Sequence, residues 1–382
     1  MLVTETDVVI IGAGPAGLAV GALLRQAGIS FVIIEKNDSV GSSWKGHYDR
    51  LRLHTSKKYS HLPGLPFPES YPDFVPKQDF ADYLDIYATR YGIEPIFGEE
   101  VIRVAKEQNN NVFIVETDNG NLWVSKSVII CTGFNRKPVM PKPDGYDIFK
   151  GPQIHSSDYE NGNVFSDQNV MVVGMGNTGA EIAMDLSDHG AKTFVSVRNP
   201  INVVPLEFRG RPTQHTNIIL NKYLPSFITD MIGNIIKNCH YHDMTKYGLN
   251  IDKKSPGKML RKEGKTPVID QGTMDYIRQG KIEVKPELTK VREHWAWFCD
   301  ESMIDIDAII FATGFKSAVE EFVEGGEELL NPYGNPYSAI PGGQWSGMYF
   351  LGFNAYKSGI LYSIQKESPK IVNHLKEYLR QF

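Results

Sequence analysis

The fold is decided by the stretch Val8-Val-Ile-Ile-Gly12-Ala-Gly14-Pro-Ala-Gly17, in which an apolar run is followed by three glycines spaced GxGxxG. A second copy occurs later in the chain, Val170-Met-Val-Val-Gly174-Met-Gly176-Asn-Thr-Gly179. One such turn is weak evidence, because glycines gather in many loops. Two turns, each with a strand pattern before it and a helical pattern after it, predict two dinucleotide sites in one protein.

Each glycine of these turns has a physical role. The first two permit the tight turn and let the backbone approach a pyrophosphate, while the third lets helix and strand pack closely. The pyrophosphate then lies at a helix N-terminus, where free N–H groups favour an anion. The residues predicted to hold the two nucleotides are Gly12, Gly14, Pro15, Ala16 and Gly17 in the first turn, and Gly174, Gly176, Asn177, Thr178 and Gly179 in the second.

The two predicted sites differ at the end of their second strand. Glu35 lies 18 residues past Gly17, and Arg198 lies 19 residues past Gly179, so the two positions correspond. A carboxylate there accepts hydrogen bonds from an adenosine ribose, whose 2′-hydroxyl is free in FAD and NAD. A guanidinium favours a 2′-phosphate, and hence NADP(H). Glu35 and its neighbour Lys36 are therefore assigned to the first nucleotide, and Arg198 to the second.

Composition restricts the class of protein. The 382 residues suit two domains with sizeable cores, and 41% hydrophobic and 22% charged residues are ordinary for globular proteins. A net charge of −5 gives no indication of nucleic acid as a partner. The three cysteines are few and widely spaced, so neither a disulfide framework nor a metal site is expected. We expect a cytoplasmic protein without a signal peptide, because the first strand begins near Asp7.

The order of the segments predicts an α/β fold with two dinucleotide-binding (Rossmann-like) domains. Two further apolar runs end in Thr132-Gly133 and Thr313-Gly314, at the strand ends where ligands lie in open parallel sheets. We expect residues 1–160 and 311–382 to form a discontinuous FAD-binding domain. Residues 161–310 would then form an inserted NADP(H)-binding domain.

Two later segments carry further expectations. Residues 218–236 have apolar residues at mostly helical spacing but no run of membrane-spanning length. They predict a buried amphipathic helix or a cover over the active site, with weak peripheral membrane contact left open. Near the C-terminus, Gly359 precedes a helix expected over 363–379. In two-dinucleotide flavoproteins the N-terminus of such a helix often faces the flavin pyrimidine edge, where negative charge grows on reduction.

One motif between the two turns makes a family resemblance specific. Phe149-Lys-Gly151-Pro-Gln-Ile-His155-Ser-Ser-Asp-Tyr159 resembles the FxGxxxHxxxY/F fingerprint of class B flavin-dependent monooxygenases. The tyrosine at the last position, Tyr159, resembles the pattern of the N- or S-oxidising and YUCCA-type branch of this family. The resemblance to the YUCCA-type enzymes extends along nearly the whole chain, with these further markers: Trp44, residues 48–55, 62–68, 246–249, 264–270 and 311–315.

The resemblance implies both cofactors and chemistry. FAD would be bound, NADPH would be the reductant, and dioxygen would give a C4a-(hydro)peroxyflavin that transfers one oxygen atom to a small substrate. The segment Leu53-His54-Thr55 would run past the flavin ring. His54 and Thr55 are our candidate catalytic residues, and Trp44 is added to the flavin contacts. His155 is interpreted as a hydrogen-bonded residue of the connection between domains rather than as a proton donor.

Several alternatives remain open at this point. A disulfide reductase would need a close cysteine pair, which the sequence lacks. An NADPH oxidase or electron-transfer flavoprotein of the pyridine-nucleotide reductase superfamily would share both turns without oxygenating a substrate. The chain departs from the plant pattern at Ser60, where cysteine is usual, and at Tyr356-Lys-Ser-Gly359, where an Arg-Arg-Gly stretch is usual. The substrate therefore stays open between a soft N or S nucleophile and a 2-oxo acid such as indole-3-pyruvate, and a homodimer is a further open possibility.

Overall fold

The protein divides into two compact units. The computed structural model describes residues 3–107, 110–263, 266–354 and 359–382. Unit 1 comprises Met1–Lys45, Thr55–Lys137 and Phe315–Phe382, and unit 2 comprises Gly46–His54 and Pro138–Gly314. Each unit contains one of the two glycine turns, which follows an interior strand of its sheet, β1 (Val3–Ile11) in unit 1 and β9 (Asn169–Val173) in unit 2.

Unit 1 is built on a seven-stranded sheet of order β3-β2-β1-β6-β5-β4, with β21 also paired to β6. The parallel core is β1 between β2 and β6, in which Val9 pairs with Val32 and Val128. The last three residues of β1 and of β6 are apolar and buried, as is typical of parallel strands whose two faces are covered. The strand bounds are β1 Val3–Ile11, β2 Phe31–Glu35, β3 Ile96–Phe97, β4 Val101–Glu107, β5 Val112–Thr117, β6 Leu122–Ile130 and β21 Met348–Phe350.

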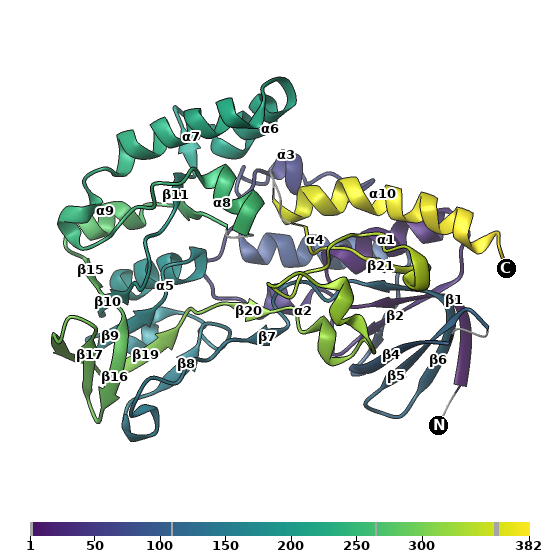
Figure 1. The fold of residues 1–382 in the computed structure, drawn as a ribbon, viewed down its shortest axis with the longest axis horizontal. Coiled ribbons are helices and arrows are strands. Elements are labelled where there is room, and N and C mark those ends of the chain that lie inside the picture. Colours follow the sequence, from purple (N-terminus) through teal and green to yellow (C-terminus); the bar gives the residue numbers. More distant parts are fainter. Residues whose placement is uncertain (1–2, 108–109, 264–265, 355–358) are drawn as a thin grey trace. The chain divides into compact units, whose positions relative to one another are not determined.

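Figure 1 shows α1 and α10 side by side on one face of the unit 1 sheet. Helix α1 begins at Pro15, whose missing N–H costs nothing at a first helical position. Its small residues, such as Gly17 and Gly21, are buried and permit close packing. The helices of unit 1 are α1 Pro15–Gln26, α2 Ser42–Lys45, α3 Lys57–Ser60, α4 Lys77–Arg90 and α10 Ile360–Leu379, and the short strand β20 is Phe315–Lys316.

Unit 2 is built on a five-stranded sheet of order β15-β10-β9-β19-β8 in which every pairing is parallel. The core lies between this sheet and its flanking elements, where Phe311 and Phe194 are buried. The three antiparallel strands β16, β17 and β18 form a separate small sheet. The strand bounds are β8 Gln153–His155, β9 Asn169–Val173, β10 Lys192–Ser196, β15 Ile282–Lys285, β16 Leu288–Arg292, β17 Trp295–Phe298, β18 Met303–Asp305 and β19 Ala308–Phe311.

The remaining elements of unit 2 are helices and short strands. Helix α5 follows the second glycine turn, and β14 pairs in parallel with β11. The bounds are α5 Asn177–Asp188, α6 Thr213–Tyr223, α7 Ser226–Tyr241, α8 Pro256–Glu263, α9 Thr273–Arg278, β11 Val203–Pro205, β12 Glu207–Phe208, β13 Arg211–Pro212 and β14 Val268–Asp270, while β7 Lys137–Pro138 lies where the chain leaves unit 1.

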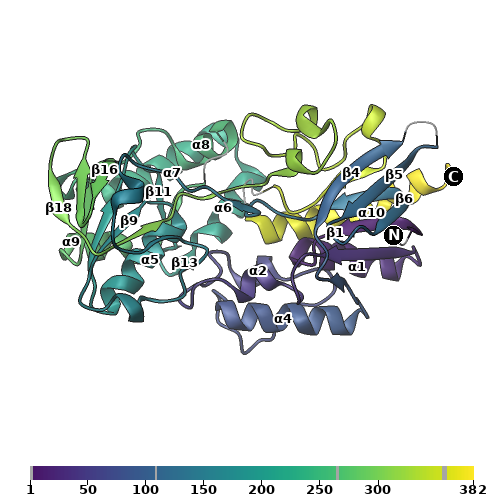
Figure 2. The same cartoon turned by 90° about the horizontal axis from the view of Figure 1, so that it is seen from below.

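The expectation of a buried amphipathic helix over 218–236 is wrong, while its alternative, a cover over the active site, stays a prediction. The segment forms two helices, α6 and α7, interrupted at Leu224 and Pro225, which both have extended backbone (Figure 2). Proline has no N–H to continue a helix, and it disfavours helical geometry in the preceding residue. No residue of α6 is buried, and the buried residues of α7 are Lys237 and Tyr241. Five large apolar side chains are instead more than half exposed, namely Ile219, Tyr223, Phe227, Met231 and Ile235.

The boundaries of the units differ from those expected for the domains. The later crossings lie at 137/138 and 314/315, whereas boundaries at 160/161 and 310/311 were expected. Residues 46–54 also join unit 2, although unit 1 both precedes and follows them in the chain. The fingerprint motif at 149–159 therefore lies within unit 2, and β8, which contains His155, is an edge strand of its sheet.

Candidate active site

The two glycine turns have the same backbone geometry. Gly12 and Gly174 both have φ of 103°, which favours glycine. A Cβ on Gly17 would lie 1.9 Å from the Gly12 carbonyl oxygen, and one on Gly179 would lie 2.1 Å from that of Gly174. The third glycine is therefore required for α1 and α5 to start against their strands. This part of the sequence prediction corresponds closely to the structure.

The second glycine of each turn faces open space. A Cβ on Gly14 or Gly176 would meet no atom within 4 Å. Both residues are N-caps of their helices, α1 and α5, and neither helix has a side-chain cap. The first N–H groups of both helices are thus available to an anion, and the backbone is bare where a pyrophosphate would approach.

Glu35 is buried and holds the first turn together. Its Oε2 accepts a hydrogen bond from the Ala13 N–H at 2.7 Å. Its Oε1 accepts from both the backbone and the side-chain nitrogen of Asn37, each at 3.0 Å. The carboxylate therefore lies beside the turn, as a ribose-binding residue must, while Lys36 is exposed.

The threonine predicted for the flavin site has an unpartnered hydroxyl. Thr132 follows β6, and its Oγ1 is buried without a hydrogen-bond partner among the residues that the structure describes. The corresponding Thr313 in unit 2 donates instead to the Val139 carbonyl at 2.5 Å. Gly133 and Gly314, which follow these threonines, both have positive φ, and a Cβ on either would meet no atom within 4 Å. Among the described residues, the threonine hydroxyl after β6 is thus free, whereas the one after β19 is hydrogen-bonded.

Arg198 lies at the end of β10, and its side chain is 71% exposed. Its nearest charged partner is Glu287, with Nε and Oε1 4.0 Å apart, so the pairing is loose. An exposed ion pair of this length contributes little to stability. The guanidinium is therefore free to bind another anion. In the same unit, the Asn177 side chain accepts from the Ile269 N–H at 2.6 Å and so ties the turn to β14.

The other predicted flavin-site residues lie in unit 1. Trp44, on α2, stacks edge-on against Phe80 with ring centroids 4.5 Å apart. Gly359 has positive φ and is the N-cap of α10, so the helix expected over 363–379 begins a few residues earlier. Residues 356–358 of the departure from the plant pattern, and residues 264–265 of one family marker, lie outside the described residues.

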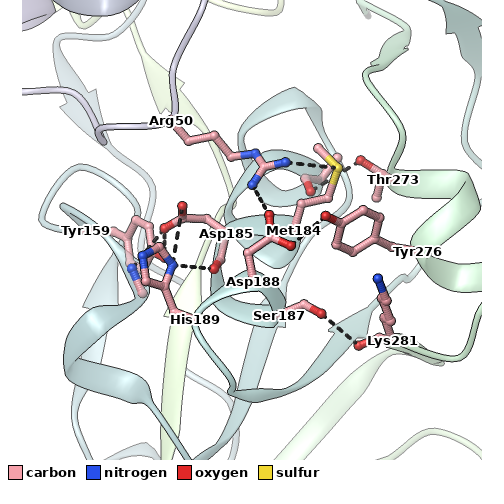
Figure 3. A network of polar contacts seen from close by, with 12 residues as sticks. Arg50, Tyr159, Met184, Asp185, Ser187, Asp188, His189, Thr273, Tyr276 and Lys281 are labelled. Carbon is pink, nitrogen blue, oxygen red and sulfur yellow. Dashed lines mark hydrogen bonds and ion pairs between the residues drawn. The ribbon is translucent and has the colours of Figure 1, made fainter.

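Two carboxylates of α5 bind other segments of unit 2, Asp188 the segment 46–54 and Asp185 the fingerprint segment. Asp188 accepts from Arg50 and from the Tyr276 hydroxyl, and Asp185 accepts from the Tyr159 hydroxyl at 2.6 Å (Figure 3). Burial alone would raise the pKa of Asp188, but the hydrogen bonds from Tyr276 and Arg50 outweigh it and hold the pKa below its usual value. The Arg50–Asp188 pair thus joins the segment 46–54 to the rest of unit 2.

The two candidate catalytic residues fall on opposite sides of a unit boundary. His54 belongs to unit 2, where its Nε2 lies 2.5 Å from Oε1 of the buried Glu181. Thr55 belongs to unit 1, where its hydroxyl is 2.7 Å from that of Ser60. Ser60 is buried and donates a structural hydrogen bond to the Ser56 carbonyl. The serine that departs from the plant pattern thus helps to fix the loop that contains Thr55.

The fingerprint residues hold unit 2 together. Phe149 is in the core, and a Cβ on Gly151 would lie 1.9 Å from the Asp307 carbonyl oxygen. His155 Nδ1 accepts from the Ser157 N–H at 3.1 Å, which assigns the ring proton to Nε2, 3.1 Å from the Gly314 carbonyl oxygen. Burial lowers the pKa of His155 below its usual 6.5, against the effect of that carbonyl. A neutral, fully bonded imidazole is suited to structure rather than to proton donation.

Two contributors to the site were missed from the sequence. In the sequence, Glu181 occupies what looks like an ordinary polar position of a helix. In the structure it is buried and binds both His54 and Tyr48. Gly352, after β21, has positive φ, and a Cβ there would lie 3.1 Å from Cβ of Ala16 at the start of α1. The signal for Glu181 was its place two residues after Gly179. The signal for Gly352 was a glycine at the carboxyl end of a strand.

The residues present fit a flavin in unit 1 and a nicotinamide dinucleotide in unit 2. In unit 1 the observations are the bare Gly14, the uncapped α1 and the unpartnered Thr132 hydroxyl. In unit 2 they are the bare Gly176, the uncapped α5 and the loosely held Arg198. All three cysteines are free, with Cys131 buried and the others exposed. Together these features define a two-nucleotide flavoprotein.

Comparison with known proteins gives the family. Residues 5–327 match the model of the family described as "Flavin-binding monooxygenase-like". The chain is 38% identical over 377 residues to the probable indole-3-pyruvate monooxygenase YUCCA1 of Arabidopsis thaliana, covering 97% of this chain and 90% of that protein. It is 35% identical over 360 residues to the indole-3-pyruvate monooxygenase YUCCA8 of Oryza sativa subsp. indica, covering 91% and 86%.

A solved structure shows the same fold. The flavin-containing monooxygenase of Stenotrophomonas maltophilia has a TM-score of 0.73 at 20% identity, covering 98% of this chain and 99% of that one. The chain belongs to the flavin-binding monooxygenase-like family. It is a flavin-dependent monooxygenase whose cofactors are FAD and NADPH, which confirms the expected class, fold and cofactors.

Proposed function

We propose that unit 1 holds FAD, that unit 2 holds NADPH, and that the enzyme oxygenates a small 2-oxo acid. The carrying observation is that the two turns have equal backbone geometry, whereas the residues after the helix and strand that follow them have opposite charges, Glu35 in unit 1 and Arg198 in unit 2. Support for a 2-oxo acid comes from the relatives, whose names specify indole-3-pyruvate and which match over most of the chain.

The residues of unit 1 would bind and orient FAD. Glu35 would accept from the ribose, the first N–H groups of α1 would face the pyrophosphate, and Thr132 would donate or accept through its free hydroxyl. Bound FAD would supply the hydride-accepting and oxygen-activating chemistry. The chain itself supplies orientation and water exclusion, with His54 and Thr55 proposed to contact the reacting groups.

The residues of unit 2 would select and place NADPH. The uncapped N-terminus of α5 would bind the pyrophosphate, and Arg198 would bind the 2′-phosphate. The loose pairing of Arg198 with Glu287 means that little is lost when the guanidinium turns to the phosphate. Asn177 is bonded to Ile269, so it fixes the turn and is proposed to act on NADPH through that geometry.

The overall reaction balances for a 2-oxo acid. The substrate R–CH2–CO–COOH, dioxygen, NADPH and one proton give R–CH2–COOH, carbon dioxide, NADP⁺ and water. One oxygen atom of O2 enters the new carboxylate and the other leaves as water. A thioether or tertiary amine would instead take that atom on sulfur or nitrogen, without loss of carbon.

Labelled dioxygen tests the proposal. The holoenzyme is incubated with NADPH, ¹⁸O2 and, separately, indole-3-pyruvate, phenylpyruvate, a thioether and a tertiary amine. We expect one ¹⁸O atom in the carboxylate from a 2-oxo acid, at a rate above those of the other two classes. Label on sulfur or nitrogen alone would overturn the substrate class. Hydrogen peroxide as the only oxygen product, with every substrate, would favour the NADPH oxidase alternative.

Location and assembly are separate proposals. Among the residues that the structure describes, no helix has the length and apolar character to cross a membrane. We propose a cytoplasmic enzyme with weak peripheral contact to lipid, supported by the exposed apolar side chains of α6 and α7. Sedimentation with phosphatidylcholine vesicles tests this contact, and Phe227→Asn should reduce it. The homodimer stays a prediction, to be checked by light scattering.

A further inference from the structure

A row of hydrogen bonds in unit 2 joins Tyr48 and His54 through Glu181, on the helix that follows the second glycine turn. The Tyr48 hydroxyl lies 3.2 Å from Glu181 Oε2, and His54 Nε2 lies 2.5 Å from Glu181 Oε1. One end of the row, His54, has a predicted role toward the flavin. Its centre, Glu181, has none so far.

The chemistry of the row fixes the direction of each bond. The Glu181 side chain is 3% exposed, and as a carboxylate it can only accept. Burial first, and then the negative charge of Glu181, raise the pKa of Tyr48, so its hydroxyl stays a donor. His54 Nε2 must therefore carry a hydrogen that points at Glu181. Among the described residues of unit 2, the other ring nitrogen, Nδ1, has no hydrogen-bond partner.

The position of His54 in the chain shows which unit holds its side chain. His54 is the last residue of the segment 46–54, and Thr55 begins a new stretch of unit 1. Glu181 follows the second glycine turn directly, on the helix whose N-terminus is proposed to bind NADPH. A side chain proposed to contact the reacting groups is thus held by the nicotinamide-binding unit, not by the flavin-binding unit.

We propose that Glu181 is the positioning residue of His54, fixing Nε2–H toward α5 and leaving Nδ1 for the bound cofactor or substrate. The proposal rests on the proposed function only for the identity of the group, cofactor or substrate, that contacts Nδ1 of His54. Its core, the fixed ring orientation and tautomer, concerns residues of this chain alone. A buried carboxylate with both oxygens engaged is rigid enough for such a role, since hydrogen bonds to a charged group are stronger than those between neutral groups.

The alternative is that Glu181 merely stabilises unit 2. A matched control exists one turn along the same helix, because Asp185 is also buried and also binds a tyrosine hydroxyl. Its hydrogen bonds go to Tyr159 and to the Gly162 N–H, and not to the segment 46–54. Glu181→Gln and Asp185→Asn thus remove equivalent charges from α5, but only the first removes the acceptor of His54.

The first measurement reads the ring directly and does not depend on activity. Histidine ring nitrogens are followed by NMR in the ¹⁵N-histidine-labelled holoenzyme, with His54 assigned from the signal missing in His54→Gln. We expect hydrogen on Nε2 of His54 in the wild type and in Asp185→Asn, and a mixture of tautomers in Glu181→Gln, whose amide can donate as well as accept. A neutral Nδ1–H tautomer in the wild type overturns the proposal even if Glu181→Gln does not fold.

The second measurement separates positioning from stability. In Glu181→Gln we expect kcat to fall about 10- to 100-fold, the cost of a misplaced group at a reacting centre, with KM for NADPH unchanged. More NADPH should also be lost as hydrogen peroxide. In Asp185→Asn we expect a lower melting temperature with kcat and peroxide release as in the wild type. Equal kcat losses in both variants, in proportion to their melting temperatures, overturn the positioning role.

The two proposals can fail separately. If the wild type oxygenates no substrate, the proposed function fails, and the NMR signals of His54 still decide the role of Glu181. If the wild type does oxygenate but the His54 signals are the same in Glu181→Gln, the proposed function stands and Glu181 is only structural.

Discussion

The two glycine turns share a backbone but differ in the helices that follow them. Both first glycines have φ of 103°, and both third glycines lie against a carbonyl that leaves no room for a methyl group. Helix α1 then buries only apolar and small residues, whereas α5 buries two carboxylates, Glu181 and Asp185. The backbone therefore defines where a pyrophosphate binds. The side chains decide which nucleotide binds and what else the unit must hold.

The largest effect should come from removing the shared geometry in one unit at a time. Gly17→Ala puts a Cβ 1.9 Å from the Gly12 oxygen and should yield protein without FAD. Gly179→Ala, at 2.1 Å from Gly174, should keep FAD but lose reduction by NADPH. Overpacking of about 3 kcal/mol corresponds to more than about a hundredfold in affinity. The ratio of flavin to protein absorbance and rapid-mixing reduction measure the two effects.

Gly14→Ala is the control for this comparison. Its Cβ would meet no protein atom, and its φ of −78° suits alanine, so the unit should fold normally. Loss of FAD from a stable Gly14→Ala protein would locate the pyrophosphate at that turn. If Gly17→Ala instead loses the response to NADPH and keeps FAD, the assignment of the two units is reversed.

The next effect should be seen where the two sites differ in charge. Arg198→Ala removes a charge-assisted contact of about 1.5–3 kcal/mol, so kcat/KM for NADPH should fall about 10- to 100-fold while that for NADH stays the same. Lys192→Ala is the control, because Lys192 is exposed at the opposite end of the same strand, β10. Steady-state kinetics with NADPH and with NADH measure the nucleotide preference of each variant. An unchanged preference in Arg198→Ala means that another residue binds the phosphate.

A smaller effect should distinguish the two threonines. The Thr132 hydroxyl has no partner among the described residues, so Thr132→Val should leave stability unchanged and weaken FAD binding about fivefold, the value of one hydrogen bond. The Thr313 hydroxyl is bonded to Val139, so Thr313→Val should lower the free energy of unfolding by about 1 kcal/mol. Titration with FAD and urea unfolding measure the two quantities. The opposite pattern would show that Thr132 has no flavin contact.

The smallest effect should be a pH dependence confined to unit 2. Burial lowers the pKa of His155 below its value of 6.5 in an unfolded chain, so the folded state prefers the neutral ring. The stabilisation is then fully present above pH 6.5 and is lost as the pH falls through and below that value. The stability difference between wild type and His155→Gln should therefore shrink between pH 7.5 and 5. Calorimetry at both pH values tests this, and a constant difference would contradict a neutral His155.

The parts that sequence patterns predicted well are those with local signals. The two strand–glycine–helix units each combine an apolar run, a fixed glycine spacing and a helical period, and the structure has β1–α1 and β9–α5 there. The threonine–glycine ends of β6 and β19 were found in the same way. Glu35 was recognisable because its distance from Gly17 is set by the length of one helix and one strand.

The parts that were missed depend on contacts between distant segments. Nothing local in residues 46–54 indicates that Tyr48, Arg50 and His54 bind carboxylates of α5, more than a hundred residues later. The buried Glu181 looks like the exposed face of an amphipathic helix, because a sequence pattern does not show which polar groups find partners. Pro225, by contrast, was a local signal for the break between α6 and α7.

The segment 46–54 also limits how the two units can be exchanged between enzymes. A chimera that transplants only Pro138–Gly314 would separate Glu181 and Asp188 from His54, Tyr48 and Arg50. Both carboxylates would then face a foreign loop. Leaving the buried Glu181 without its partners would be strongly destabilising, whereas the exposed Asp188 would lose less. The part of the chain that must be exchanged as a whole is therefore discontinuous and comprises residues 46–54 together with 138–314. Nine residues within the flavin-side sequence should co-vary with a helix of the nicotinamide unit, and recombination between family members should succeed only when both are taken from the same parent.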